Sequence, residues 1–356
     1  MHRGKLLFVA PALAIVTGIV PGITSSASAE ETPVTCNMPV SGTIKVANDL
    51  VCLDTDGLIV ASDSTVIDLN GHRITCIGSG YVGSCQGIAP LGGLSDQDPD
   101  SGIDIDGRKN VRVFSSVPGG TIGGFDNQVD ISNSDGVKVE QLVLTGPPNQ
   151  GPANPRPASH GVLIRGATCG GGTIYVGGGN SNGNDISGSN QGVAINGDCV
   201  TVVQNMIHDN NSHAGVRTGV PVIPPSNGIL VNQGQFNDLN GNAVFNNGDN
   251  DETIDSGIRV RVNSSENHIR NNIVTDNLGD GILMENGANS NKIDNNTMVG
   301  NGAALSGTTF YDAAGRNAPG GPPGSQPLNV WNQNNMCVTQ NQEVPPGTCG
   351  AGEVTL

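Results

Sequence analysis

Aromatic side chains and long apolar runs are scarce in this sequence. Phe, Trp and Tyr make up 3% of its 356 residues, and no long stretch shows the period of an amphipathic helix. A compact globular enzyme of this size usually carries more aromatic and helical content. Beyond residue 29, no segment is long and apolar enough to cross a bilayer, so we expect no membrane insertion.

Positive charge is also scarce. The 16 Lys and Arg residues face 32 Asp and Glu residues, which gives a formal charge of −16 at pH 7. A chain this acidic repels nucleic acid and anionic membranes, so we expect no nucleic-acid partner. The same charge argues against a polyanionic substrate unless cations or a local basic patch intervene.

Several catalytic and metal-binding motifs are absent from the sequence. The eight cysteines include no C-x-x-C pair, which argues against redox and zinc-binding roles. No G-x-S-x-G, Walker or dinucleotide-binding motif stands in the context that such a motif requires. We therefore do not expect a Gly-rich loop that binds phosphate.

The first 29 residues have the pattern of a secretory signal peptide. Residues 1–5 are basic, an apolar stretch runs from residue 6 to about residue 23, and Ala27-Ser28-Ala29 fits an A-x-A cleavage site. We expect cleavage at about Ala29 and a secreted or extracytoplasmic protein.

A unit recurs from about residue 57 to residue 300. In each unit a Gly opens a short strand of alternating apolar residues, and Gln128 takes the place of the Gly once. The seven opening glycines are Gly57, Gly102, Gly161, Gly192, Gly228, Gly257 and Gly281. Two more short strands and an Asn/Gly-rich turn follow each opening, and a fixed period of this kind predicts a solenoid.

Each unit divides into three short strands. In the unit that opens at Gly257 they are residues 258–260, 268–270 and 273–274. Three strands per turn predict an all-β, single-domain solenoid of roughly eight coils with three parallel sheets and disulfide-stabilised ends. Asparagines recur at matching places between the strands, and we expect them to form ladders in which equivalent amides bond from coil to coil. The matching asparagines are Asn237, Asn242, Asn267, Asn272, Asn291 and Asn296.

The first coil has family features. Asp56-Gly57-Leu58-Ile59-Val60, followed by Val66-Ile67-Asp68-Leu69-Asn70-Gly71-His72-Arg73-Ile74, resembles the first coil of exported bacterial right-handed parallel β-helix proteins. The resemblance, to the pectate lyase-like, carbohydrate-associated superfamily, covers roughly residues 36–340 and implies that fold. It implies a polysaccharide or a cell-surface glycan as the partner. The expected organisation is a signal peptide (1–29), an N-terminal cap (30–56), the β-helix (57–302) and a C-terminal draping segment with a cap (303–356).

Eight cysteines in an exported chain predict disulfides. Cys36–Cys52, Cys76–Cys85 and Cys337–Cys349 are candidate local pairs, and the repeat places Cys169 and Cys199 at nearly the same point of adjacent coils. The sequence alone leaves the connectivity open.

Extra residues concentrate at one point of the repeat. Residues 78–101, 146–160, 208–227 and 246–256 all fall between the third strand of a unit and the next opening. Insertions at one corner of successive coils gather on one edge, which often marks the binding face of a repeat protein. We therefore expect binding along the first sheet and these insertions.

The second and fourth residues after each opening are expected to point outward, because side chains alternate along a strand. This places Asp104, Asp106 and Asp130 on adjacent coils, with Arg165 one coil further and His160 beside it. Carboxylates this close either raise one another's pKa or hold a cation, and calcium suits oxygen ligands outside the cell. The alternative is that these aspartates are merely solvated.

Family resemblance assigns roles to this first cluster. By resemblance to pectate lyases, Asp104, Asp106 and Asp130 would be metal ligands for Ca²⁺ and Arg165 the catalytic base. Ser159-His160-Gly161 is similar to the Gly-His-Gly coil of polygalacturonases, which implies a catalytic role for His160. The sequence departs from both families, because it lacks their Asp-Asp, Arg-Ile-Lys and Trp-Ile-Asp-His motifs.

A second cluster of outward charges lies later in the chain. Arg259 and Arg261 are further catalytic candidates that could hold a carboxylate bidentately, and Glu285 follows one coil later. The alternative for this cluster is ion pairing with Glu285 and with the acidic residues 249–255. Glu285 is a candidate substrate-binding residue. The outward Asn196 and Asn232 are further candidates of this kind, as are His213 and Arg217 in the insertion 208–227.

Two functions remain open on these grounds. The first is a polysaccharide lyase or glycoside hydrolase that works along the first sheet, with calcium assistance in the lyase case. The second is a noncatalytic extracellular protein with a structural or cell-surface interaction role. A monomer is expected in either case. The scarcity of aromatic rings argues against sugar binding in both, because aromatic side chains usually stack on the sugar rings in such sites.

Overall fold

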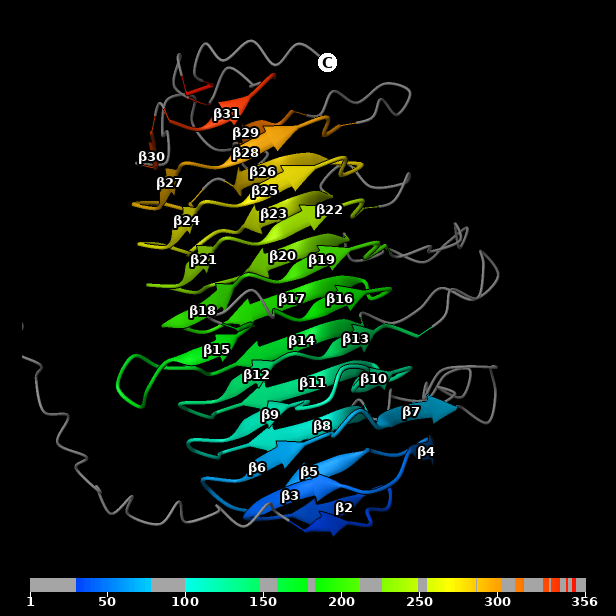
Figure 1. Cartoon of the computed structure of the whole chain (residues 1–356). Coiled ribbons are helices and arrows are strands. Elements are labelled where there is room, and N and C mark those ends of the chain that lie inside the picture. Colours follow the sequence, from blue (N-terminus) through cyan, green and yellow to red (C-terminus); the bar gives the residue numbers. More distant parts are fainter. Residues whose placement is uncertain are drawn as a thin grey trace, which may run out of the picture.

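The computed structural model describes residues 30–77, 100–147, 159–178, 183–211, 226–248, 255–285, 287–302, 311–316, 329–332, 334–339, 344 and 348–349. These residues form strands and turns, and the strands stack along one axis as a solenoid (Figure 1). No helix with the length and hydropathy to cross a bilayer occurs among them.

All strand pairs are parallel, and the strands form three sheets, which we call A, B and C. Sheet B has ten strands: β2 (Met38–Val40), β5 (Leu58–Val60), β8 (Ser101–Asp106), β11 (Asn127–Ser132), β14 (His160–Arg165), β17 (Gln191–Asn196), β20 (Asn227–Val231), β23 (Ser256–Val260), β26 (Asp280–Glu285) and β29 (Ala313–Arg316). Sheet A has eleven strands: β1 (Glu31–Thr32), β3 (Thr43–Val46), β6 (Val66–Asp68), β9 (Arg112–Phe114), β12 (Lys138–Glu140), β15 (Ile174–Val176), β18 (Val200–Val203), β21 (Asp238–Asn240), β24 (His268–Arg270), β27 (Lys292–Asp294) and β30 (Val330–Trp331). Sheet C has ten strands: β4 (Leu50–Leu53), β7 (Arg73–Ile77), β10 (Thr121–Gly123), β13 (Val143–Thr145), β16 (Asp185–Ser187), β19 (Met206–His208), β22 (Ala243–Phe245), β25 (Ile273–Thr275), β28 (Thr297–Val299) and β31 (Met336–Cys337).

Each coil runs through sheet B, then sheet A, then sheet C, and the next coil begins one strand further along each sheet. This confirms the expected all-β parallel solenoid with three sheets. Strands β1 to β4 and β29 to β31 continue the same sheets at the two ends (Figure 1). The four predicted insertions all connect a strand of sheet C to the next strand of sheet B.

The glycine that opens each unit is required by close approach between coils. A Cβ built on Gly161 would clash with the side chain of Ile186 and would lie 2.5 Å from the carbonyl oxygen of Gly192. No larger residue fits there without moving backbone, which explains why the sequence repeats Gly at this point. The first and third residues after it are buried in one continuous apolar core, as Val162 and Ile164 show.

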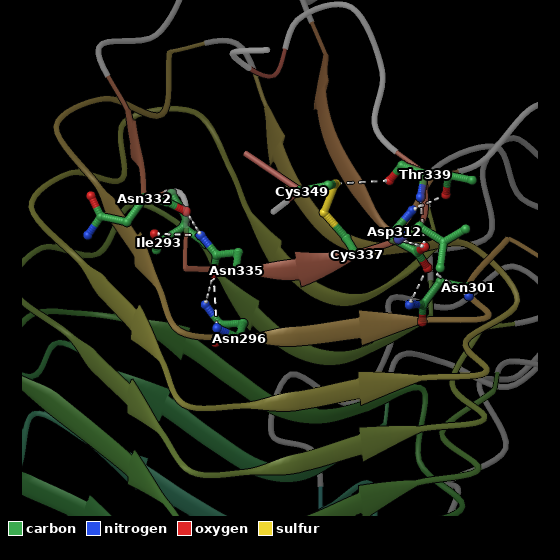
Figure 2. Close-up of a disulfide and its surroundings, with 10 residues drawn as sticks. Ile293, Asn296, Asn301, Asp312, Asn332, Asn335, Cys337, Thr339 and Cys349 are labelled. Carbon is green, nitrogen blue, oxygen red and sulfur yellow. Dashed lines mark hydrogen bonds between the residues drawn. A yellow bond between two sulfur atoms is a disulfide. The ribbon is translucent and has the colours of Figure 1, made fainter. Parts of the chain in front are cut away.

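The predicted asparagine ladders are present between the sheets. Asn242 Nδ2 donates to Asn272 Oδ1 at 3.0 Å, and Asn272 Nδ2 donates to Asn296 Oδ1 at 2.9 Å. The ladder continues to Asn335 at the C-terminal end (Figure 2). The left-handed backbone lies one residue earlier than the buried ladder, for example at Asn271, with φ 54°.

A further buried ladder was not predicted. It runs through Asn210, Asn247, Asn277 and Asn301 and ends on Asp312. Asp312 Oδ1 accepts from the backbone and side-chain nitrogens of Asn301, and its Oδ2 accepts from the backbone nitrogens of Val338 and Thr339 (Figure 2). One carboxylate therefore terminates this ladder and ties the C-terminal segment to the last coil.

Disulfides lie at both ends and in the middle of the solenoid. The pairs Cys36–Cys52, Cys169–Cys199 and Cys337–Cys349 form as expected. Cys76 is also disulfide-bonded, and its expected partner, Cys85, lies outside the described residues. Trp331 is buried against the core in the last strand of sheet A, which supports a capping role for it.

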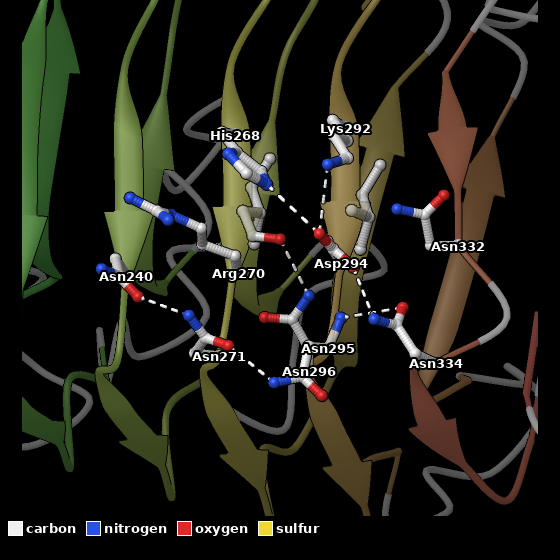
Figure 3. A network of polar contacts seen from close by, with 12 residues as sticks. Asn240, His268, Arg270, Asn271, Lys292, Asp294, Asn295, Asn296, Asn332 and Asn334 are labelled. Carbon is white, nitrogen blue, oxygen red and sulfur yellow. Dashed lines mark hydrogen bonds and ion pairs between the residues drawn. The ribbon is translucent and has the colours of Figure 1, made fainter.

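The outer face of sheet A near the C-terminal end carries a network of charges and amides (Figure 3). Asp294 accepts from Asn334 at 2.7 Å and lies 3.2 Å from the ammonium group of Lys292. The pKa of Asp294 is lowered to about 2, and the hydrogen bond from Asn334 is the main cause. An exposed row of amides, Asn240, Asn271 and Asn295, runs beside this pair (Figure 3).

Candidate functional site

The outward residues of sheet B stand in register as the repeat predicts. Asp104 pairs with Asp130, which pairs with Leu163, and Asp106 pairs with Ser132, which pairs with Arg165. We call the second residues after each opening the inner outward column and the fourth residues the outer polar column. The outer polar column contains Asp106, Ser132, Arg165, Asn196, Asn232, Arg261 and Glu285.

The two columns differ in their access to solvent. From Asp130 onward the inner outward column is buried, although its apolar members Leu163, Ala194, Leu230 and Leu283 lie outside the solenoid core. Pointing away from the core therefore does not mean exposure on this sheet. The outer polar column is exposed or half-buried except at Ser132, so it is the accessible part of the face.

A pocket of about 350 Å³ lies at the N-terminal end of this face. Its walls include the side chains of four aspartates and of Arg165, together with two serines and an asparagine. The aspartates are Asp56, Asp104, Asp106 and Asp130. Three of the four, Asp104, Asp106 and Asp130, are the predicted metal ligands. The structure therefore brings these three side chains together with Arg165 around one cavity.

Asp130 is the hub of a hydrogen-bond network in this pocket. Its carboxylate is only 3% exposed and accepts from Arg165 Nη2 at 2.7 Å, from Asn127 Nδ2 at 3.0 Å and from Ser132 Oγ at 2.9 Å. Arg165 Nε also donates to Ser132 Oγ at 3.1 Å. The Arg165 side chain remains 48% exposed and lines the pocket, while its Nη2 holds Asp130 and its Nε holds Ser132.

These contacts bear on the predicted calcium site. Both oxygens of Asp130 already accept hydrogen bonds, one of them from a cation. Within the described ranges, no three His, Cys, Asp or Glu side chains lie close enough to hold a metal ion. Calcium binding by Asp104, Asp106 and Asp130 would therefore compete with the hydrogen bonds of Asp130, and calcium stays a prediction.

His160 joins the same network through Asn127. Its Nδ1 lies 2.8 Å from Asn127 Oδ1, and its ring is half-buried at the start of β14. Burial, aided by the positive charge of Arg165, lowers the pKa of His160 to about 4. The imidazole is therefore neutral near pH 7.

Asp126 is a further perturbed acid beside this network. Burial and the neighbouring charge of Asp100 raise the pKa of Asp126 to about 7. Its Oδ1 atom is buried and has no hydrogen-bond partner among the residues that the structure describes. A carboxyl group in this state titrates near neutral pH, where an ordinary aspartate is fully ionised.

The second predicted cluster forms an ion-pair network. Arg259 Nε donates to Glu285 Oε1 at 2.7 Å, and Arg261 Nε lies 3.5 Å from Glu285 Oε2. Arg259 is 3% exposed, and burial lowers its pKa although Glu285 opposes the shift. Because Arg259 is closed to solvent, these contacts favour the ion-pairing reading for it, while Arg261 remains accessible.

The remaining predicted residues fall in two groups. Asn196 and Asn232 are half-buried neighbours in the outer polar column, and Asn232 Nδ2 donates to Asn196 Oδ1 at 2.7 Å. His213 and Arg217 lie outside the described residues, as does the predicted signal peptide, residues 1–29.

One outward column was missed from the sequence, apart from its member His160. The residue immediately before each opening also borders the site: Asp56 and Ser101 line the pocket, and Asn127 bridges His160 and Asp130. A sequence signal existed, because this position is polar in every unit. Its members are Asp56, Ser101, Asn127, His160, Gln191, Asn227, Ser256 and Asp280.

Parallel strands wound into three sheets, with the polar face on sheet B, define a parallel β-helix. The sequence profile of the family described as "Right handed beta helix region" matches residues 160–341. The chain belongs to this family, and the expected right-handed parallel β-helix is confirmed. No curated protein sequence matches the chain.

The structure is similar to several solved structures. The Dettilon tailspike protein is 15% identical with a TM-score of 0.46, and the match covers 82% of this chain and 59% of the tailspike. A double mutant of the periplasmic alginate epimerase AlgG is 15% identical with a TM-score of 0.38, over 84% of this chain and 74% of that one. The AlgE6 A-module, a mannuronan C-5 epimerase of Azotobacter vinelandii, is 13% identical with a TM-score of 0.28, over 81% and 90%. This chain therefore spans well under two thirds of the tailspike's length.

Proposed function

We propose that this protein is an extracytoplasmic β-helix that binds or acts on a polysaccharide along the outer polar column of sheet B. The observation that carries the proposal is the continuity of this column. It runs over seven successive strands, from Asp106 in the acidic pocket to Glu285. At a strand spacing of ~4.8 Å its length is about 29 Å, which suits an extended polymer.

The chemistry of the column suits hydroxyl-rich ligands. Carboxylates, amides and guanidinium groups alternate along it, and each can donate to or accept from sugar hydroxyls. The disulfides support an extracytoplasmic location, because structural disulfides persist in oxidising compartments.

Charge narrows the choice of polymer. The pocket walls place four carboxylates against one guanidinium, and the whole chain carries a formal charge of −16. Without a bridging cation, this end of the face favours a neutral polysaccharide over a uronate polymer. If Asp104, Asp106 and Asp130 held Ca²⁺, the cation would offset the negative charge of a uronate polymer, and such a polymer would become a candidate substrate for a lyase reaction.

The test is a panel of neutral and uronate polysaccharides, each assayed with and without Ca²⁺. Binding, unsaturated products and new reducing ends would be measured for the wild type and for Arg165→Ala. The control variant is Arg270→Ala, which removes an exposed ion pair on sheet A. The proposal predicts at least one ligand whose binding or turnover falls ~10-fold or more in Arg165→Ala and is unchanged in the control. It fails if no polysaccharide binds, or if both variants behave alike.

A noncatalytic role is the second candidate. The observation that favours it is that Asp130, Ser132 and Arg165 satisfy one another, as residues of a structural network do. This reading predicts binding of a glycan or a cell-surface partner without product formation in the same panel.

A further inference from the structure

Asn127 occupies a position that fixes the orientation of its own amide. It lies in the column before the opening residues, is only 1% exposed, and contacts Asp130 on one side and His160 on the other. Asp130 is the ion-pair partner of Arg165, so its carboxylate accepts hydrogen bonds and donates none. The amide nitrogen of Asn127 must therefore face Asp130.

The orientation of Asn127 in turn fixes the proton on His160. With Nδ2 facing Asp130 at 3.0 Å, the oxygen Oδ1 faces His160 Nδ1 at 2.8 Å. Oδ1 is an acceptor, so Nδ1 must be the donor and must carry the ring proton. In a neutral imidazole the other nitrogen, Nε2, then carries a lone pair.

The lone pair on Nε2 has no competing partner within the part of the chain that the structure describes, because His160 makes its side-chain hydrogen bond through Nδ1. The ring is half-buried and stands in the column that borders the pocket. A nitrogen of this kind is available to accept a hydrogen bond from a ligand on the face.

We propose that Asn127 is a positioning residue: it holds His160 in the tautomer with its proton on Nδ1, so that Nε2 can accept a hydrogen bond from a hydroxyl of a glycan bound at the face. The identity of that hydrogen-bond donor rests on the proposed function. Because the ring is neutral near pH 7, no proton is transferred in this contact.

The chain offers matched variants for this proposal. Asn127→Leu keeps the branched shape and the number of heavy atoms of the side chain, and it removes both the acceptor for His160 and the donor to Asp130. Asn227 holds the same column position on β20 and is fully buried, so Asn227→Leu is the control. Asp130→Asn removes the acceptor-only group and lets the Asn127 amide turn over, which gives a second route if Asn127→Leu fails to fold.

The test is nitrogen NMR of the full chain labelled with ¹⁵N-histidine, with the His160 signals assigned by their loss in His160→Gln. The proposal predicts a protonated Nδ1 and an unprotonated Nε2 at pH 7 in the wild type and in Asn227→Leu. Asn127→Leu and Asp130→Asn should show both tautomers. A wild-type ring that carries its proton on Nε2, or a tautomer unchanged in both site variants, overturns the proposal.

Affinity supplies the second readout. With a polysaccharide that the wild type binds, Asn127→Leu should weaken binding by ~2- to 10-fold, because a glycan hydroxyl loses its oriented acceptor. An equal loss of affinity in Asn227→Leu contradicts a positioning role. If no polysaccharide binds, the proposed function fails, while the NMR result still decides the role of Asn127.

Discussion

Asp130 and Arg165, on neighbouring strands β11 and β14, form an ion pair of 2.7 Å at the bottom of the acidic pocket. The carboxylate is buried and the guanidinium is half exposed, so the pair joins the interior of the solenoid wall to its accessible face. The strength of this link can be measured by removing the buried partner.

Asp130→Ala should lower the free energy of unfolding by ~1–3 kcal/mol, because it leaves the donors of Asn127 and Ser132 without their acceptor. Urea unfolding measures this loss. Asp106→Ala, an exposed aspartate of the same face, should change stability by less than ~0.5 kcal/mol. Equal losses in the two variants would show that the pocket network does not stabilise the fold.

Glu285→Ala should lower the free energy of unfolding by ~2–3 kcal/mol, because Arg259 would be left as a buried charge without its partner. In the double variant Arg259→Leu/Glu285→Ala the inner outward column becomes apolar from Leu230 to Leu283, and most of the loss should be recovered. A double-mutant cycle by urea unfolding measures both. Additive losses would contradict the ion-pairing account of the second cluster.

Asp312→Asn should lower the free energy of unfolding by ~1–3 kcal/mol, because an amide NH₂ would then face backbone N–H donors that need an acceptor. Amide hydrogen exchange at Val338 and Thr339 should quicken as the C-terminal segment loosens. Asp198→Asn is the matched control. Its amide oxygen can still accept from the backbone N–H of Gln235, so the free energy of unfolding should change little. Unchanged exchange at both sites would contradict the terminating role of Asp312.

Asp126→Asn should raise the melting temperature at pH 8 and have little effect at pH 4. The pKa of Asp126 is raised from its ordinary value of 3.8 to about 7, so the folded chain binds this proton more tightly than the unfolded chain. That contribution to stability is complete below pH 4 and is lost as the pH rises through about 7. The gain at pH 8 should be ~2–4 °C. Asp276→Asn, at an exposed aspartate, is the control; equal pH profiles for the two variants would contradict the raised pKa.

The repeat allowed much of the fold to be predicted. Gly161 and its equivalents recur because no Cβ fits between the coils, and Asn242, Asn272 and Asn296 recur because each amide bonds to the next. Constraints that act identically on every coil leave a period in the sequence. The right hand of the solenoid came from resemblance to a family, since the period by itself does not distinguish the two hands.

The site was predicted less completely, for two physical reasons. Alternation along a strand fixes the direction of Leu163 or Arg259 but not what covers it, so the burial of the inner outward column could not be read from the repeat. The second reason is that the sequence does not determine which group Asp130 contacts. Asp130 could have held a cation or paired with Arg165, and side-chain distances decide between the two. Asn127 was not predicted because strand alternation was applied only to the residues after each opening, although the position before each opening is polar in every unit.

The central claim is that a polysaccharide lies along the outer polar column of sheet B. Hydrogen-exchange mass spectrometry of the full chain, with and without a saturating polysaccharide from the panel, tests it most directly. The account predicts slower exchange in segments of sheet B and the turns that follow them, from about residue 101 to residue 136 and again near Asn196 and Asn232. Protection confined to sheets A or C, or no protection with any bound polysaccharide, would contradict it.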